Sequence, residues 1–313
     1  MPKGLNERLI NHQVSDADLT AVSAIRLQLA SCKGMLDGPQ ARDSFDQMME
    51  VTPVAAGVEY QAGTVGGVPG TWCRLKQPKA DTAILYLHGG GYVVGTANAY
   101  RHLAGQFAAR TGLDAYVADY GLAPEHPFPT AFNHAKATYV GLVEAGYQQI
   151  VIVGDSAGGG LSLSLATQIS EDLKSVHGIA PVCCAIMSPW TDLTLSGGSH
   201  EALAEEELFL TRAGLEALAH HYLAGHDPRD PVASPLFGLN GKLPPLQIHV
   251  GAAEILLSDT LEYAKRAHTA GATITTHVWE AMPHVFPNGF ALLEAAERAM
   301  TMMSEFIVSH LKA

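Results

Sequence analysis

The feature that most constrains this chain is residues 150–159, Ile-Val-Ile-Val-Gly-Asp-Ser-Ala-Gly-Gly. The apolar β-branched start predicts a buried strand, and the apolar pattern that follows predicts a helix. Ser156 therefore lies in a tight strand-to-helix turn, between Gly154 and Gly158. Such a turn strains the serine backbone and leaves no room for side chains two residues away on either side. The hydroxyl would project above the sheet beside free helix N–H groups, as in a serine nucleophile, although a plain glycine-rich turn remains the alternative.

Strands and helices alternate along most of the chain, which predicts an α/β fold. Two antiparallel edge strands are expected within residues 58–75, and buried strands follow. The expected strands are 82–87, 114–120, 150–153, 182–187, 246–251 and 273–279, and helices are expected near 99–110, from the proline-rich loop 122–129 to about 144, and at 161–166, 259–270 and 289–311. Alternation of this kind predicts a mostly parallel sheet with right-handed crossovers and helices on its flanks.

Two segments are expected to form a helical cap over the sheet. Residues 1–50 are interpreted as helical and as preceding any strand, with an N-cap at Ser15-Asp16. The apolar positions of the two helices are Leu19, Val22, Ile25 and Leu29, then Ala41, Phe45, Met48 and Met49. The two methionines could line a pliable apolar pocket or simply cover core. The expected division is an N-terminal cap segment at 1–50 and a catalytic domain at 51–313, with a cap insertion at about 191–225.

Composition excludes several classes of partner. The net charge of −12 argues against nucleic acid and anionic membrane surfaces. The four cysteines form no Cys-x-x-Cys pair, so reduced thiols are expected rather than disulfides or a metal site. No apolar run approaches the roughly 18 residues of a membrane span, and the N-terminal residues lack the apolar core of a signal peptide. A cytoplasmic protein is expected, and a homo-oligomer is left open.

A serine hydroxyl needs a base, and the base needs an orienting acid. In a sheet of this type the acid is expected after a late strand and the histidine after the last one. Glu254 follows the strand 246–251, and His284 follows the strand 273–279. Asp259 is the rival acid, although a carboxylate at a helix start is also explained by capping.

The sequence His-Gly-Gly-Gly-Tyr at residues 88–92 follows another buried strand. An oxyanion that forms on a carbonyl must meet backbone N–H groups without side-chain obstruction. Gly90, Gly91 and Ala157 are predicted to supply these donors, and His88 is expected to brace the turn. The alternatives are a flexible loop or a phosphate cradle, but the partner residues of a phosphate or dinucleotide motif are absent from the sequence.

These motifs resemble those of the hormone-sensitive lipase group, the bacterial family IV carboxylesterases. The matching stretches are residues 88–92, 119–129, 154–159 and 188–190 and the Pro283-His284 region, which together span the chain from about residue 82 to the end. The resemblance implies an α/β-hydrolase fold with a helical cap, no cofactor and hydrolysis of short acyl esters. It also implies Ser156 as nucleophile, His284 as base and Gly90, Gly91 and Ala157 as the oxyanion hole.

Two positions depart from the family pattern. The family's acid is usually aspartate, whereas Glu254 is one methylene longer, which keeps Asp259 as the alternative. The family's loop usually carries arginine where Gly121 stands, so an ion pair that braces this loop is expected to be missing. The predicted function is a carboxylesterase for short- to medium-chain acyl esters. The alternatives are an inactive small-molecule binder on the same fold, or an amidase or peptidase.

Overall fold

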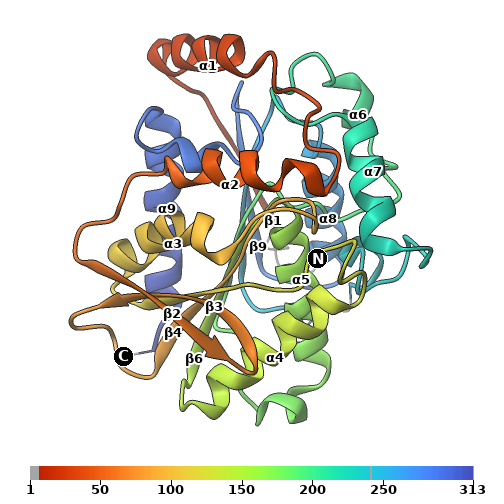
Figure 1. Ribbon diagram of the computed structural model, residues 1–313. Coiled ribbons are helices and arrows are strands. Elements are labelled where there is room, and N and C mark those ends of the chain that lie inside the picture. Colours follow the sequence, from red (N-terminus) through yellow and green to blue (C-terminus); the bar gives the residue numbers. More distant parts are fainter. Residues whose placement is uncertain (1–6, 240–241, 313) are drawn as a thin grey trace, which may run out of the picture.

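The computed structural model describes residues 7–239 and 242–312 and is built on one twisted nine-stranded sheet (Figure 1). The order across the sheet is β1-β9-β8-β7-β6-β4-β5-β3-β2. The strands are β1 (Glu7–His12), β2 (Val58–Val65), β3 (Val68–Leu75), β4 (Thr82–Leu87), β5 (Asp114–Ala118), β6 (Gln149–Asp155), β7 (Cys184–Met187), β8 (Leu246–Gly251) and β9 (Ile274–Trp279). Strand β3 runs antiparallel to β2 and β5, and the other pairs are parallel. The predicted fold class is confirmed.

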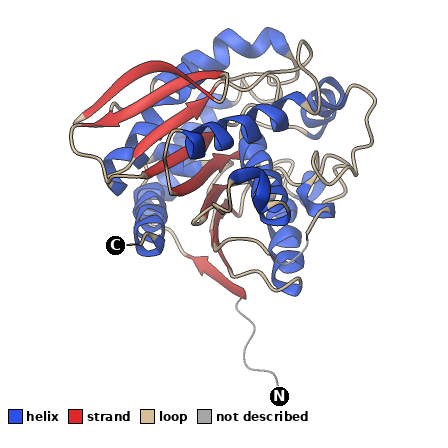
Figure 2. Cartoon of the chain, turned by 90° about the horizontal axis from the view of Figure 1, so that it is seen from below, coloured by secondary structure: helices blue, strands red, loops and turns tan. Residues whose placement is uncertain are grey.

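Helices cover both faces of the sheet (Figure 2). Helices α3 (Ala97–Thr111) and α9 (Glu294–His310) pack against each other, while α4 (Thr130–Glu144) packs against α5 (Ser156–Glu171). Helix α8 (Leu257–Thr269) contacts β8 and β9. The central strands β4 and β5 are buried along their whole length, as expected for parallel strands covered on both faces. The short 3-10 turns are Pro39–Ala41, Leu173–Val176, Pro235–Phe237 and Phe286–Gly289.

The segments expected to form a cap fold as short helices. These are α1 (Asp16–Leu29), α2 (Arg42–Glu50), α6 (Ser199–Ala202) and α7 (Arg212–Leu223). Ser15 is the N-cap of α1, as predicted, in a reciprocal capping box with Asp18. Asp18 also accepts a hydrogen bond from the N–H of Ala295 in the first turn of α9, at 3.2 Å. The start of α1 is thereby tied to the start of α9, near the other end of the chain.

One element contradicts the sequence interpretation. Residues 7–12 were expected to belong to a helical segment that precedes any strand, but they form β1, which pairs in parallel with β9. A six-residue edge strand that pairs across more than 260 positions of sequence leaves no local hairpin signal. The N-terminal segment therefore contributes the sheet edge as well as two helices that lie over it (Figure 1).

Candidate active site

Ser156 stands at the junction of β6 and α5 with a φ of 53°, a left-handed conformation that is rare for residues other than glycine. A Cβ built on Gly154 would overlap Ser162, and one built on Gly158 would overlap the carbonyls of Leu87 and His88. The two flanking glycines are therefore required by the packing of the turn. The strain that the sequence predicted at this serine is present.

The structure brings Ser156, His284 and Glu254 into one hydrogen-bonded row. His284 Nε2 lies 3.0 Å from Ser156 Oγ, and His284 Nδ1 lies 3.0 Å from Glu254 Oε1. Because a carboxylate only accepts, Nδ1 carries the imidazole proton and Nε2 is left to accept from the hydroxyl. The side chain of Glu254 is fully buried, whereas that of His284 retains 9% exposure. The row therefore runs from the protein interior toward an accessible serine.

The second oxygen of Glu254 is held by the loops around it. Oε2 accepts a 2.7 Å hydrogen bond from the hydroxyl of Ser188 and a 2.9 Å bond from the N–H of Gly251. The Ser188 oxygen in turn accepts from the N–H of Val285, at 3.1 Å. One buried hydroxyl therefore links the carboxylate to the loop that carries His284. The sequence analysis quoted Ser188 as part of a matching stretch but gave it no role.

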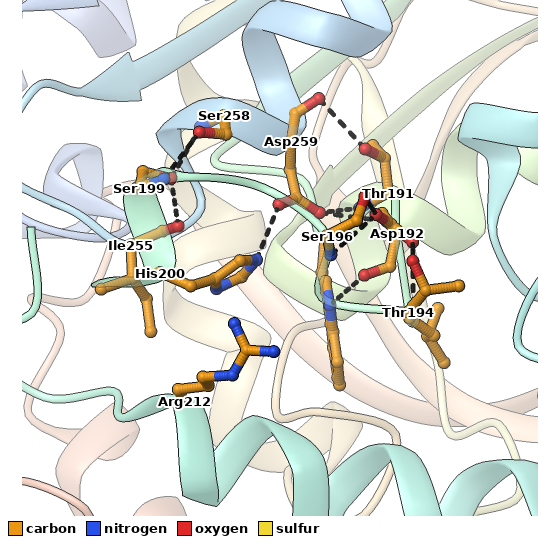
Figure 3. Close-up of polar contacts among 12 residues, drawn as sticks. Thr191, Asp192, Thr194, Ser196, Ser199, His200, Arg212, Ile255, Ser258 and Asp259 are labelled. Carbon is orange, nitrogen blue, oxygen red and sulfur yellow. Dashed lines mark hydrogen bonds and ion pairs between the residues drawn. The ribbon is translucent and has the colours of Figure 1, made fainter. Parts of the chain in front are cut away.

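Asp259, the rival carboxylate, faces a different histidine. Its Oδ2 lies 3.3 Å from Nε2 of His200 (Figure 3). Its Oδ1 accepts from the backbone N–H groups of Thr191 and Asp192, both at 3.0 Å. Burial raises the pKa of this carboxyl. The structure thus places Asp259 with the loop after β7 and gives His284 to Glu254.

The glycine turn is anchored on each side of the predicted donors. His88 Nδ1 donates to the carbonyl of Gly89 at 2.7 Å, so the expected bracing by His88 is present. The carbonyl of Gly90 accepts from the N–H groups of Val93 and Val94 at 3.1 and 3.0 Å. Within the described part of the chain, no hydrogen bond uses the N–H of Gly90 or of Gly91. These two donors are left available to a ligand.

Asp155, next to the serine, anchors the same turn from beneath. Its Oδ1 accepts from the hydroxyl of Tyr86 at 2.9 Å and from the N–H of Gly89 at 3.1 Å. Its Oδ2 accepts from the hydroxyl of Tyr100 at 3.2 Å. Burial raises the pKa of Asp155 to about 6, against the lowering effect of its hydroxyl donors. The side chain therefore joins the serine turn to the start of the glycine turn.

Three carboxylates set the charge state of His284. Burial by itself lowers the pKa of this imidazole, but the charge and hydrogen bond of Glu254 oppose it, with further contributions from Glu207 and Asp155. The net result is a pKa above the ordinary value of 6.5. A histidine in such a field is well suited to hold the proton that it takes from a nucleophile.

Glu207 is a buried member of the site that the sequence analysis missed. Its Oε1 accepts from the N–H groups of Phe209 and Leu210, at 2.9 and 3.2 Å. Its Oε2 accepts from the N–H of Ile255, which directly follows Glu254, at 3.1 Å. The available sequence signal is its position as the last residue of an acidic run, Glu205-Glu206-Glu207, directly before the apolar residues 208–210. It fixes the second cap segment to the loop of the proposed triad acid.

An apolar cavity of about 240 Å³ opens over Ser156. Its walls come from both cap segments and from the residues after β9. They include Ile25, Leu29, Phe45, Met48, Met49 and Phe286. The cavity is also lined by Ser156, His284 and Gly90. The hydrogen-bonded row of Ser156, His284 and Glu254 therefore ends at the wall of an apolar cavity. Met48 and Met49 line this cavity, and they also belong to or pack against the main hydrophobic core, so both of the expected roles are present.

The proline-rich loop 122–129 has an ion pair, although the sequence predicted that none would brace it. Glu125 forms an ion pair with Arg42 of α2, with Nη1–Oε1 and Nη2–Oε2 distances of 2.9 and 2.6 Å. The prediction that this loop lacks its brace was therefore wrong, because the cation comes from the cap rather than from the loop itself.

All four cysteines are free, as predicted. In residues 7–239 and 242–312, no helix is long and apolar enough to cross a membrane, and no cluster of histidine, cysteine or acidic residues is placed to hold a metal ion.

Comparison with known proteins agrees with this geometry. A family model described as the alpha/beta hydrolase fold matches residues 84–288, and the chain belongs to this family. An acetyl-hydrolase of Streptomyces hygroscopicus is 37% identical over 246 residues, 78% of this chain and 81% of its own length. An esterase of Acinetobacter venetianus is 32% identical over 271 residues, 86% of this chain and 88% of its own.

Solved structures narrow the class further. A crystal structure of an esterase from the bacterial hormone-sensitive lipase family superposes with a TM-score of 0.86 at 31% identity, covering 95% of this chain and 99% of that one. A hormone-sensitive lipase from a metagenome library gives 0.87 at 31% identity, covering 96% and 100%. The chain is a member of the bacterial hormone-sensitive lipase group of esterases, and the resemblance inferred from the sequence is confirmed.

Proposed function

We propose that this protein hydrolyses carboxylic esters with short- to medium-length acyl groups through Ser156, His284 and Glu254. The observation that carries the proposal is the row of two 3.0 Å hydrogen bonds that ends at a strained serine on the wall of an apolar cavity. The esterase and acetyl-hydrolase relatives support the reaction class.

In the proposed acylation step, Ser156 Oγ attacks the ester carbonyl carbon while His284 Nε2 takes the hydroxyl proton. Glu254 keeps the imidazole in the required tautomer and stabilises its charged form. The carbonyl oxygen becomes an oxyanion that the N–H groups of Gly90, Gly91 and Ala157 stabilise. Ala157 supplies such a donor because the first N–H groups of α5 have no partner within the helix.

The tetrahedral intermediate then collapses and the C–O bond to the alcohol breaks. His284 gives its proton to the leaving alkoxide, and the acyl group stays on Ser156. Water enters, His284 takes a proton from it, and the hydroxide attacks the acyl carbon. Collapse of the second intermediate releases the carboxylic acid and returns the proton to Ser156.

Cavity size supports the proposed range of acyl lengths. At about 240 Å³ the space lies below the roughly 300–1,000 Å³ of pockets that hold drug-sized ligands. The two methionines in its wall are flexible and polarisable, so the wall can adapt to acyl groups of somewhat different shape. A series of aryl esters from acetate to decanoate is expected to show a maximum of kcat/KM at short or medium chain length.

The decisive test is hydrolysis of an aryl butyrate by the purified protein and by Ser156→Ala. The variant keeps the fold and loses the attacking oxygen, so turnover is expected to fall by about 10⁶-fold, as for other removed serine nucleophiles. A fluorophosphonate probe is expected to label the wild type and not the variant. Retention of full turnover by Ser156→Ala would refute the mechanism, and an unlabelled, inactive wild type would favour a ligand binder on this fold.

A further inference from the structure

The guanidinium of Arg42, in the first turn of α2, binds three backbone and side-chain groups of the catalytic domain. Besides the paired contacts to Glu125, Nε donates to the carbonyl of Val93 and Nη2 donates to the carbonyl of Ala123, both at 2.9 Å. Val93 directly follows the glycine turn and donates its N–H to the carbonyl of Gly90, whereas Ala123 belongs to the proline-rich loop. Arg42 therefore contacts both the end of the glycine turn and the proline-rich loop.

These contacts bear on the direction of an oxyanion donor. The carbonyl of Gly90 and the N–H of Gly91 belong to one planar trans peptide unit, so they point in opposite directions. The Gly90 carbonyl is held by the N–H groups of Val93 and Val94. Fixing those two residues fixes the peptide plane, and with it the direction of the Gly91 N–H.

Arg42 holds this tightly turned segment at two points. It binds the Val93 carbonyl directly. It also binds the carbonyl of Ala123, whose N–H donates to the carbonyl of Tyr92 at 2.9 Å. The first contact reaches Val93 through one hydrogen bond. The second reaches Tyr92 through two hydrogen bonds, by way of Ala123.

The loop cannot readily supply this cation from its own sequence. A Cβ on Gly121 would lie 2.9 Å from Cβ of His126 and 2.9 Å from Cγ2 of Thr130, closer than side-chain carbons approach. Position 121 carries no cation, and Glu125 pairs with Arg42 of α2. Its hydrogen bonds from Arg42 lower the pKa of the carboxyl to about 2, so the pair stays charged over the working pH range of an esterase.

We propose that Arg42 is a positioning residue for the oxyanion turn, so that cap helix α2 contributes to the rate of the chemical step and not only to enclosure of the substrate. This inference rests on the proposed esterase function and deepens it. A guanidinium fork that meets a carboxylate and two carbonyls is a rigid brace, because its donors lie in one plane.

The test compares Arg42→Met with Glu50→Gln on aryl butyrate. Glu50 lies at the other end of α2 and holds it to α3 through Arg101 and Asn98, at 3.2 and 3.0 Å, without touching the glycine turn. It is thus a matched control for the seating of the helix. Arg42→Met is expected to lower kcat by about tenfold to a hundredfold, as for small misplacements of catalytic groups, while KM changes little. Glu50→Gln is expected to keep the wild-type kcat.

A trifluoromethyl ketone of similar shape to the substrate separates positioning from simple loss of structure. It forms a tetrahedral adduct whose oxyanion needs the same donors as the transition state. Its inhibition constant is expected to rise in proportion to the fall in kcat/KM for Arg42→Met. The milder Arg42→Lys keeps the positive charge but loses the planar guanidinium. Its kcat and its inhibition constant for the ketone are both expected to lie between those of the wild type and Arg42→Met.

Three results would overturn the inference. One is a wild-type kcat in Arg42→Met, or in Arg42→Lys if the methionine variant does not fold. Another is a rise in KM alone, which would limit α2 to substrate enclosure. The third is an equal loss of kcat in Glu50→Gln, which would mean that kcat depends on how α2 packs on the domain and not on Arg42 itself. If instead the wild type itself is inactive and unlabelled by fluorophosphonate, the proposed function fails first.

Discussion

Two buried carboxylates, Glu254 and Asp259, lie five residues apart in sequence, and each faces a histidine. Glu254 contacts His284, which reaches Ser156 on the wall of the cavity. Asp259 contacts His200 of α6, whose side chain is fully buried (Figure 3). By residue type alone the two pairs are nearly interchangeable.

The difference between the pairs lies in what the second histidine nitrogen can reach. Nε2 of His284 accepts from the Ser156 hydroxyl beside an apolar space, so a proton can pass between the proposed nucleophile and the proposed base. His200 Nε2 lies 3.3 Å from the carboxylate of Asp259, and neither ring nitrogen of His200 has a hydrogen-bond partner among the described residues. A histidine–carboxylate pair therefore supports catalysis only when the far nitrogen faces both a nucleophile and an accessible volume.

The largest expected contrast is between Glu254→Ala and Asp259→Ala. Loss of Glu254 leaves His284 without an orienter, and kcat for an aryl butyrate is expected to fall by about 10⁴-fold, as when a triad acid is disabled elsewhere. Loss of Asp259 leaves two backbone N–H groups without their acceptor. Each such buried donor costs about 1–3 kcal/mol, so the free energy of unfolding is expected to drop while folded protein keeps most of its turnover.

Steady-state kinetics and urea unfolding of both variants check this contrast. Turnover is normalised to the folded fraction, because Asp259→Ala is expected to be less stable. If Asp259→Ala proves to be the inactive variant and Glu254→Ala stays active, the assignment of the acid is reversed.

Ser188→Ala is expected to give a smaller loss. The variant removes the hydroxyl that donates to Glu254 and accepts from the N–H of Val285. Both the proposed acid and the loop of His284 lose a restraint, and kcat is expected to fall by roughly tenfold, by analogy with the hydrogen-bond partners that orient metal ligands in other enzymes. Ser199 is a matched control, because its buried hydroxyl donates to the Ile255 carbonyl next to Glu254 but, among the described residues, contacts neither the Glu254 carboxylate nor the loop of His284. Equal kcat losses in Ser188→Ala and Ser199→Ala would contradict a specific role.

The smallest expected effect is a displaced pH profile in Glu207→Gln. His284 must be neutral to act as base, and its pKa is raised, so kcat/KM is expected to fall as pH drops through a value above 6.5. Removing the Glu207 charge makes the imidazolium less favourable, which lowers the pKa of His284. The acid limb is then expected to move to lower pH. An acid limb that stays in place, measured between pH 5 and 9, would mean that this carboxylate has no electrostatic effect on the base.

Much of the catalytic region could be predicted because its signals are local. The strained turn at Ser156 follows from glycines two residues on either side, whose missing side chains are required by nearby backbone. The glycine run at 88–92 marks a turn for the same steric reason. The positions of Glu254 and His284 after late strands also followed from the alternation of strands and helices.

Other features could not be read from the sequence, because they join residues far apart in the chain. Strand β1 is a short edge strand that pairs with residues near the other end, and nothing beside it in sequence announces that pairing. The brace from Arg42 to Glu125 spans 83 positions. Ser188 and Glu207 act through buried hydrogen bonds to the loops of the acid and the base, which sequence patterns do not encode.

The sequence by itself determined the alternating fold, the strained serine and the turn of unobstructed N–H groups, since each depends on steric limits within a few residues. Tertiary structure alone decided which carboxylate meets which histidine, and which arginine binds the residue that follows the glycine turn. Those pairings depend on how separate helices and loops pack against one sheet. Small differences in this packing direct similar side chains either toward a cavity or into the core.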